Sequence, residues 1–340
     1  MSSAKRVLVT GASGQLGRRL VPRLKADGYA VRAHYRNEEK ALKYCPSGAE
    51  RIYGDLLSPD WLETAVRDCD MVIHGAAWVS LRQVDDRIMH EVNVEGTQKV
   101  VAACVRAGVK RLLHISSVVT IGAAQKGNIC DERTINNLAT CGIPYFTTKY
   151  LAERAAFDGM RSGLEVVVVN PSIMIPPPGR AVTRQDMEKI PRFIPSYFDL
   201  GLNLVSTLDV VEGIVSALEK GRSGERYILA GENLDMPGAF KLARKYKSIR
   251  GPALKIPRML IISAGFIFDA VYYLKKSVRP ETRAPRLGYR LAKQAGKYFH
   301  YSSAKAVNEL GYKFRTAELI IEDYLQYTGL TAENEIKPRA

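Results

Sequence analysis

Short apolar runs alternate with longer stretches of mixed apolar and polar residues along most of this chain. Stretches such as Val92–Ala107 carry apolar residues at helical spacing, which predicts amphipathic helices. Strands that alternate with helices predict an α/β fold with a doubly wound parallel sheet, because parallel neighbours need a crossover helix. The predicted strands are Arg6–Val9, Ala30–Tyr35, Arg51–Ile52, Met71–Ile73, Arg111–Ile115, Glu165–Val169 and Glu225–Leu229.

The pattern loosens after Asn170, where Pro176-Pro177-Pro178-Gly179 predicts a loop. Long loops beyond strand ends are where α/β proteins bind substrates. We therefore predict a nucleotide-binding domain over 1–170 plus about 207–230. Residues 171–206 and 231–330 are expected to form a smaller substrate-binding part, and 331–340 a flexible tail.

A glycine-rich turn, T-G-A-S-G-Q-L-G over 10–17, joins the first predicted strand to a helix with leucines at 16, 20 and 24. Glycines tolerate positive φ and leave room for a pyrophosphate against the helix N-terminus. This strand–turn–helix context predicts a Rossmann-type dinucleotide site. The expected contacts are Thr10, Gly11, Ser13, Gly14, Gln15, Leu16 and Gly17.

The end of the second predicted strand indicates which dinucleotide binds. An acidic residue there favours the ribose diol of NAD(H), whereas an arginine suits the 2′-phosphate of NADP(H). Arg36 occupies this region with no acidic residue before Glu38, and Lys43 could add a second cation. We therefore expect NADP(H) rather than NAD(H), the alternative being that Arg36 is a solvated strand-end charge. Asp55, Leu56, Gly75, Ala76 and Ala77 follow the next two strands and are expected to line the same site.

Proton transfer to a carbonyl oxygen could use a tyrosine with a lysine one helical turn away. The pattern Y-x-x-x-K occurs four times, beginning at Tyr145, Tyr272, Tyr289 and Tyr301. Only Tyr145 and Lys149 lie between the fifth and sixth strands, where the nicotinamide of a doubly wound fold is expected. Position therefore favours this pair over the others.

These motifs resemble, in order, those of the extended short-chain dehydrogenases/reductases. The resemblance rests on Thr10–Gly17, Asp55-Leu56, Gly75–Ala77, Asn93-x-x-Gly96-Thr97, Ser116-Ser117, Tyr145-x-x-x-Lys149 and Asn170-Pro171, and it covers roughly residues 6–328. Within that branch the chain is most similar to the dihydroflavonol 4-reductase and 3β-hydroxysteroid dehydrogenase group. Gly224–Gly231 and Ser303–Tyr312 also resemble that group.

The resemblance implies a role for several residues. Ser117 would polarise a substrate carbonyl, Tyr145 would act as acid/base, and Lys149 would contact the cofactor ribose and lower the tyrosine pKa. Asn93 would tie two loops together, and Pro171 would lie near the carboxamide. Ser116 and Ser172 are expected beside the cofactor.

The sequence departs from the family pattern at Thr120-Ile121-Gly122 and Ile175-Pro176-Pro177, two places that border the substrate. Apolar residues near these places predict a pocket for a hydrophobic ketone, aldehyde or alcohol. Packing beneath a loop is the alternative for Phe193 and Phe198. The predicted pocket residues are Trp78, Val79, Ile121, Ile173, Phe193 and Tyr197, with Phe198 nearby, around Ser117 and Tyr145.

The chain has 50 Lys and Arg against 35 Asp and Glu, a net charge of +15. Between Lys241 and Lys297 there are fifteen basic and two acidic residues, a local balance of +13, beside the apolar run Met259–Leu274. That run is shorter than a membrane-spanning helix needs. A basic apolar segment over 255–297 suits an anionic membrane surface. The alternatives are a substrate-domain helix, a homodimer contact or docking of a CoA thioester, whereas no motif suggests nucleic acid.

Five scattered cysteines without a C-x-x-C pair predict neither a metal site nor disulfides. The first strand begins near residue 6 and leaves no room for a signal peptide, so we expect a cytoplasmic protein, with peripheral contact at the inner membrane surface if the basic segment binds lipid. The expected function is NADP(H)-dependent interconversion of a hydrophobic carbonyl compound and its alcohol. The alternatives are an NAD-dependent nucleotide-sugar epimerase or dehydratase and a non-catalytic NADP-binding protein.

Overall fold

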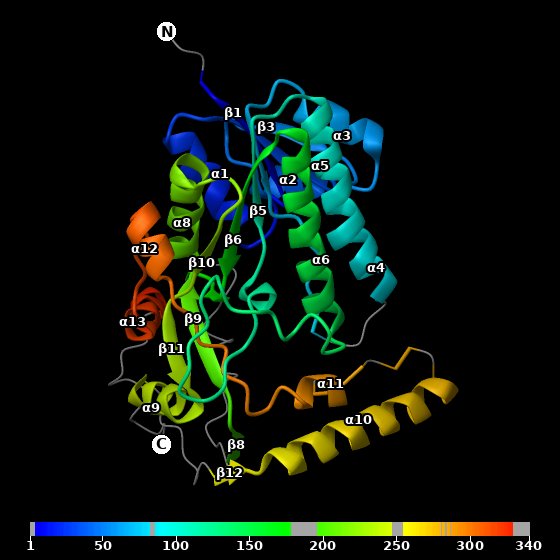
Figure 1. Cartoon of the computed structure of the whole chain (residues 1–340), viewed down its shortest axis with the longest axis vertical. Helices are drawn as coiled ribbons and strands as arrows, with labels where there is room; N and C mark the ends of the chain where they lie inside the picture. Colours follow the sequence, from blue (N-terminus) through cyan, green and yellow to red (C-terminus); the bar gives the residue numbers. More distant parts are fainter. Residues whose placement is uncertain are drawn as a thin grey trace.

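The computed structural model describes residues 4–81, 86–177, 196–246, 254–279, 281–282, 284–285 and 287–328. Phe193 and the predicted tail 331–340 lie outside these residues. The fold of the described chain is shown in Figure 1.

All seven strands expected from the sequence form one parallel sheet. They are β1 (Arg6–Thr10), β2 (Ala30–Tyr35), β3 (Glu50–Tyr53), β4 (Met71–His74), β5 (Arg111–Ile115), β6 (Glu165–Pro171) and β10 (Arg226–Leu229). Their order is β10-β6-β5-β4-β1-β2-β3, and every neighbouring pair is parallel. The order reverses between β1 and β4, which is the point where doubly wound folds bind ligands. The fold class predicted from the sequence is confirmed.

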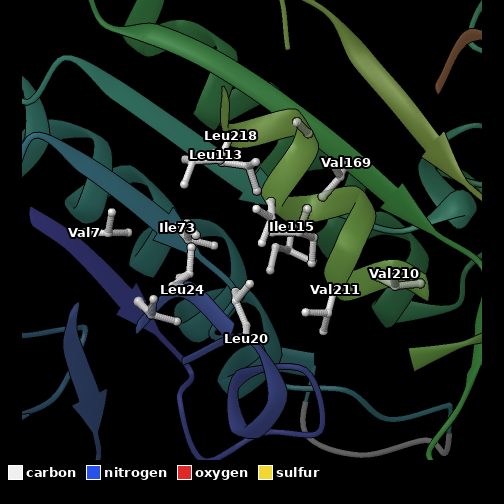
Figure 2. Close-up of a cluster of buried hydrophobic side chains, with 14 of the residues drawn as sticks. Val7, Leu20, Leu24, Ile73, Leu113, Ile115, Val169, Val210, Val211 and Leu218 are labelled. Carbon is white, nitrogen blue, oxygen red and sulfur yellow. The ribbon is translucent and has the colours of Figure 1, made fainter. Parts of the chain in front are cut away.

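Helices cover both faces of this sheet, as apolar strands buried on two sides require. On one face, α1 (Gly17–Ala26) and α8 (Thr207–Lys220) pack against alternate strand residues, and Figure 2 shows Leu20, Leu24 and Val211 over Ile73 and Ile115. The other face is covered by α3 (Pro59–Val66), α5 (Gly96–Arg106) and α6 (Pro144–Asp158). The sheet therefore lies between two apolar layers.

Three helices differ from, or add to, what the sequence pattern predicts. The helix expected over Val92–Ala107 begins instead as a π-helical turn, Glu91–Glu95, which follows α4 (Asp86–His90) and continues as α5. Helix α1 runs through Pro22, whose side chain is exposed. A further helix, α2 (Glu38–Tyr44), follows β2 and is capped by the Asn37 side chain.

The remaining elements form smaller sheets and helices beside the strand C-termini. Strands β7 (Ile173–Ile175), β9 (Gly201–Ser206) and β11 (Glu232–Asp235) form a sheet of order β11-β9-β7, and β8 (Ser196–Phe198) pairs with β12 (Leu254–Ile256). Five helices complete this part: α9 (Met236–Tyr246), α10 (Arg258–Val278), α11 (Tyr289–Ala292), α12 (Ala304–Leu310) and α13 (Ala317–Thr328).

Helix α10 lies along one end of the molecule, with α11 between it and the rest of the fold (Figure 1). Within the described ranges, no helix combines the length and apolar character that crossing a membrane requires.

Candidate active site

The glycine turn brings the ends of β1 and β4 into direct backbone contact. Gly11 has φ +76°, and a Cβ there would lie 2.9 Å from the amide nitrogen of Ala76. A Cβ on Gly17 would lie 2.4 Å from the Gly11 carbonyl oxygen, so α1 starts tightly against the turn. No side chain caps this end of α1 among the described residues. The turn thus offers bare backbone at the N-terminus of a helix, which fits a pyrophosphate.

Two predicted cofactor residues of the turn instead have partners within the fold. The Thr10 hydroxyl is buried, hydrogen-bonds the His74 ring at 2.8 Å and accepts from the amides of Gly75 and Ala76. The Gln15 amide donates to the Thr207 hydroxyl at 2.7 Å, at the start of α8. Thr10 therefore shapes the floor of the turn, and Gln15 links it to α8.

A cleft of about 400 Å³ opens above the turn, and we call it the cofactor cleft. It gathers most residues expected from the sequence: Gly11, Ser13, Gly14, Arg36, Asp55, Leu56, Gly75, Ala76, Ala77 and Trp78. Leu16 and Gly17 belong to the start of α1 beneath it, and neither contributes to the cleft lining. Residues from four consecutive strand ends therefore converge on one elongated site.

The cationic rim of the cleft differs from expectation in one residue. Lys40 lines it beside Arg36, whereas Lys43 does not, and the Lys43 ammonium lies 5.4 Å from the centre of the Tyr44 ring. Within the described chain, neither Arg36 nor Lys40 forms an ion pair. Lys40 could have been found from the sequence, since it lies in the first turn of the helix that follows Arg36.

Ser117 and Tyr145 are brought together at the end of β5. Both side chains are partly exposed, and they lie near enough for the Ser117 hydroxyl to affect the pKa of Tyr145. Burial raises the pKa of Tyr145, and the Ser117 hydroxyl only partly offsets this rise. Ser116 is instead buried, with its hydroxyl 3.4 Å from that of Thr120. Of the two serines, Ser117 is the one that faces the tyrosine.

Lys149 lies one turn after Tyr145 on α6 and is almost completely buried. Its ammonium donates to the Ile115 carbonyl oxygen at 2.8 Å. Burial lowers the pKa of Lys149 to about 8, and the nearby Glu153 carboxylate opposes that shift. The lysine was expected to lower the tyrosine pKa, but here its ammonium is bonded to the strand, and desolvation dominates at Tyr145.

A buried carboxylate that the motifs did not reveal organises this region. Glu153 accepts from the Thr120 hydroxyl at 2.6 Å and the Asn170 amide at 2.8 Å, and it pairs with Arg226 at 3.1 Å. Thr120 and Asn170 also donate to the Ser117 carbonyl oxygen. Glu153 follows Lys149 by four residues, so its helical spacing was the available signal.

Asn93 joins the cleft wall to the helix of Tyr145. Its side chain accepts from the Trp78 amide at 2.7 Å and donates to the Trp78 carbonyl and the Thr148 hydroxyl. Asn93 was expected to link two loops, and in the structure it links one loop, at Trp78, to helix α6, at Thr148. Pro171 ends β6, and the adjacent Ser172 hydroxyl is buried with no partner among the described residues.

The predicted substrate residues do not all face one pocket. Trp78 lines the cofactor cleft, and Val79 and Ile173 are exposed apolar residues on neighbouring segments. Ile121 is fully buried among Val118, Cys130, Ile228, Ala230 and Tyr301, so it is a core residue rather than a pocket wall.

The two aromatic residues of β8 also lie away from the cleft. Tyr197 stacks edge-on with Phe240 of α9 and lines a separate cavity, and Phe198 packs beneath α10. Phe198 is therefore a packing residue, although it packs against a helix rather than under a loop.

Two buried histidines neighbour the site without entering it. His74 hydrogen-bonds Thr10 and Thr97, and burial lowers its pKa to about 3. His114 lies on the next strand, and burial lowers its pKa well below the usual range. Both rings are therefore neutral at physiological pH and act as packed core residues.

The described residues contain no group of His, Cys, Asp and Glu side chains able to hold a metal ion. A larger cavity of about 850 Å³ lies along α6 and β10. Its charged groups are largely paired with each other, as in Arg133–Asp131, Arg226–Glu153 and Lys305–Glu225. We therefore assign the chemistry to the cofactor cleft and its Tyr145 end.

Comparison with known proteins identifies the family. Residues 7–230 match the NAD-dependent epimerase/dehydratase family. A farnesyl-dihydroquinoline-oxide ketoreductase of Stigmatella aurantiaca is 31% identical over 341 residues, which cover 98% of this chain and 100% of that protein. The sterol demethylase protein B of Methylococcus capsulatus is 30% identical over 311 residues, or 89% of this chain and 92% of that protein.

Matches also include a dihydroflavonol 4-reductase of Zea mays. Among solved structures, that of gox2253 is similar with a TM-score of 0.76 and 30% identity, and the match covers 96% of this chain and 99% of that one. The chain belongs to the NAD-dependent epimerase/dehydratase family and is a nicotinamide-dinucleotide-dependent oxidoreductase of the extended short-chain dehydrogenase/reductase type.

Proposed function

We propose that this protein is an NADP(H)-dependent reductase that interconverts a hydrophobic ketone or aldehyde and its alcohol. The observation that carries this proposal is the partly exposed pair Ser117 and Tyr145 at the end of β5, in a fold whose cofactor cleft is rimmed by Arg36 and Lys40. A bound NADPH would supply the hydride, and the residues of this chain would orient the carbonyl and provide the proton.

Each of the three residues has a physical basis for its role. The Ser117 hydroxyl would donate to the carbonyl oxygen, on which negative charge develops. The raised pKa of Tyr145 keeps its phenol protonated, which is the form that donates to that oxygen. With a pKa of about 8, Lys149 stays mainly charged at neutral pH, and its ammonium would contact the cofactor ribose.

The rim of the cleft supports NADP(H). Two cations without ion pairs in the described chain, Arg36 and Lys40, suit the two negative charges of a 2′-phosphate. Ser172, a buried hydroxyl that lacks a partner among the described residues, fits a polar group of the nicotinamide end.

Apolar surface near the cleft supports a hydrophobic substrate. Trp78 is 39% exposed, and Val79 and Ile173 are more exposed still. The names of two relatives refer to a sterol and to a farnesylated quinoline oxide, both largely apolar. The specific carbonyl compound would be found by a screen.

Tyr145→Phe tests the proposal. We expect wild-type protein to oxidise NADPH with some member of a panel of hydrophobic ketones, and the variant to be slower by roughly 100- to 10,000-fold, the usual contribution of a positioned acid. NADPH affinity, measured by fluorescence titration, should stay within a few-fold. An active Tyr145→Phe variant would overturn the mechanism. If the protein held NAD tightly and converted a nucleotide sugar, it would be an epimerase or dehydratase instead. If it bound NADPH but turned over no substrate, it would be a non-catalytic NADP-binding protein.

A further inference from the structure

Helix α10 presents an apolar face that nothing in the described chain covers. Only Ile261, Gly265, Asp269 and Tyr272 on this 21-residue helix are buried, and these recur every three or four residues along one side. Nine larger apolar side chains are between 44% and 78% exposed: Met259, Leu260, Phe266, Ile267, Phe268, Val271, Tyr273, Leu274 and Val278. A patch of this size on a surface marks an interaction site rather than an ordinary solvent face.

The buried side of α10 shows that the helix is firmly docked in this orientation. A Cβ on Gly265 would lie 2.6 Å from that of Ala292, so α10 and α11 approach closely. The Asp269 carboxylate accepts from the Tyr289 amide at 2.9 Å, at the start of α11. The one acidic residue in the apolar run therefore faces inward, and the outward face carries no charge from Met259 to Leu274.

Positive charge lies at both ends of this face. Lys255 and Arg258 precede the apolar run, and Lys275, Lys276 and Arg279 follow it. Lys255 is bound to Asp199 and Arg258 to the Ala295 carbonyl, whereas the three cations at the far end form no ion pair with any described residue. An apolar helix face with exposed cations at its end matches an interfacial, anionic lipid surface.

The charges disfavour a second copy of this chain as the partner. If two α10 helices packed together, basic groups would meet basic groups in either relative direction, and like charges at an interface are unfavourable.

We propose that α10 lies in the surface of an anionic membrane, with its outward apolar face among the lipid chains and Lys275, Lys276 and Arg279 at the headgroups. The active site would then be close to the lipid. Leu291 of α11 packs in the same cluster as Tyr145 and Phe146, and Arg290 donates to the Gly142 carbonyl oxygen just before α6. Helix α11, which packs against α10 at Gly265, therefore lies between the membrane helix and the region of Tyr145.

Vesicle co-sedimentation with the full chain tests this inference without using enzyme activity. Wild-type protein should bind vesicles of phosphatidylcholine mixed with phosphatidylglycerol at low salt, and bind less at high salt or to phosphatidylcholine alone. Ile267→Gln/Leu274→Gln should lower the partition coefficient at least tenfold, because each side chain stops contributing apolar burial. Lys275→Gln/Lys276→Gln should lower it about fivefold for each lysine.

The matched control is Ile129→Gln/Ile135→Gln, which removes two exposed isoleucines from another surface and should bind like the wild type. Equal thermal unfolding curves would show that all variants fold. The inference fails if the wild-type protein does not bind the mixed vesicles, or if both helix variants bind these vesicles as well as the wild type does. It also fails if Ile267→Gln/Leu274→Gln converts a dimer to a monomer while leaving vesicle binding unchanged, which would identify a second copy as the partner.

Discussion

Arg36 and Lys40 give the most direct residue-level test of cofactor choice. We expect Arg36→Ala and Lys40→Ala each to raise the dissociation constant for NADPH roughly 10- to 100-fold, the size of a lost hydrogen bond to a charged group. Affinity for NADH should change little, because it lacks the 2′-phosphate. Fluorescence titration with both cofactors would measure the difference.

Lys43→Ala is the matched control for that prediction. Its ammonium lies against the Tyr44 ring and not in the cofactor cleft, so the variant should bind NADPH like the wild type. If Lys43→Ala and Lys40→Ala weakened NADPH binding equally, the placement of these two lysines would be contradicted.

We expect the activity to depend on pH through the charge of Lys149, which Glu153 influences. A lysine is charged below its pKa, so kcat/KM for NADPH should fall as pH rises through about 8 and Lys149 loses its proton. The Glu153 carboxylate opposes the lowering of the Lys149 pKa, so Glu153→Gln should move this decline to lower pH. The pH profile of each protein with a reducible ketone gives the midpoint.

Glu63→Gln serves as the reference in that experiment, because its ion pair with Arg106 is half exposed and far along the chain from the site. It should leave the midpoint unchanged. A Glu153→Gln protein that folds normally and keeps the wild-type midpoint would show that Glu153 has no electrostatic influence on Lys149.

Single residues could be placed from the sequence where a motif fixed their backbone position. Gly11, Gly14, Gly75, Arg36 and Asp55 all line the cofactor cleft. The prediction failed for Ile121, because whether an apolar side chain faces a cleft or the core depends on residues distant in sequence, here Ile228 and Tyr301. Glu153 was missed because its partners come from three separate segments.

At the level of elements, the start of α1 depends on the absence of a side chain at Gly17. A Cβ there would lie 2.4 Å from the Gly11 carbonyl oxygen and 2.5 Å from the Ala12 Cα, and backbone cannot yield as a flexible side chain can. Gly17→Ala should therefore lower the free energy of unfolding by about 1–3 kcal/mol and weaken NADPH binding. Denaturant unfolding and cofactor titration would measure both effects.

Gly96→Ala gives a matched comparison at the start of another helix. The nearest atoms to its added Cβ are 3.7 and 3.9 Å away, which are ordinary contacts. We expect unchanged or slightly higher stability, since alanine favours helix by up to about 1 kcal/mol over glycine. Equal losses in both variants would mean that the tight contact at Gly17 is not what limits substitution.

Strands were the most predictable elements. The seven apolar runs all became strands of one sheet, with ends within two residues of the prediction, because central parallel strands are uniformly apolar. Helix α5 was less predictable at its start, where a π-helical turn places Asn93 toward Trp78 and Thr148. Apolar periodicity reports the buried face of a helix but not a local change of winding.

For the whole molecule, the loosening of the strand–helix alternation after Asn170 predicts a division into a nucleotide-binding domain and a substrate-binding part, and this division stays a prediction. The arrangement of the small sheets was not predictable, since β7, β8 and β9 pair with strands that come much later in the chain. The sequence pattern also did not predict that Asp269 faces inward. This position explains why the apolar run of α10 contains one acidic residue.

The close packing of α10 against α11 also has an evolutionary consequence. Gly265 and Asp269 allow few replacements, whereas most apolar side chains on the outward side of the same helix are largely exposed. The two sides can therefore change independently. A descendant could exchange the outward residues for polar ones, or restore them, without disturbing the catalytic sheet. Attachment of the enzyme to a surface would be a trait that this lineage can gain or lose one residue at a time, and a protein engineer could remove it in the same way.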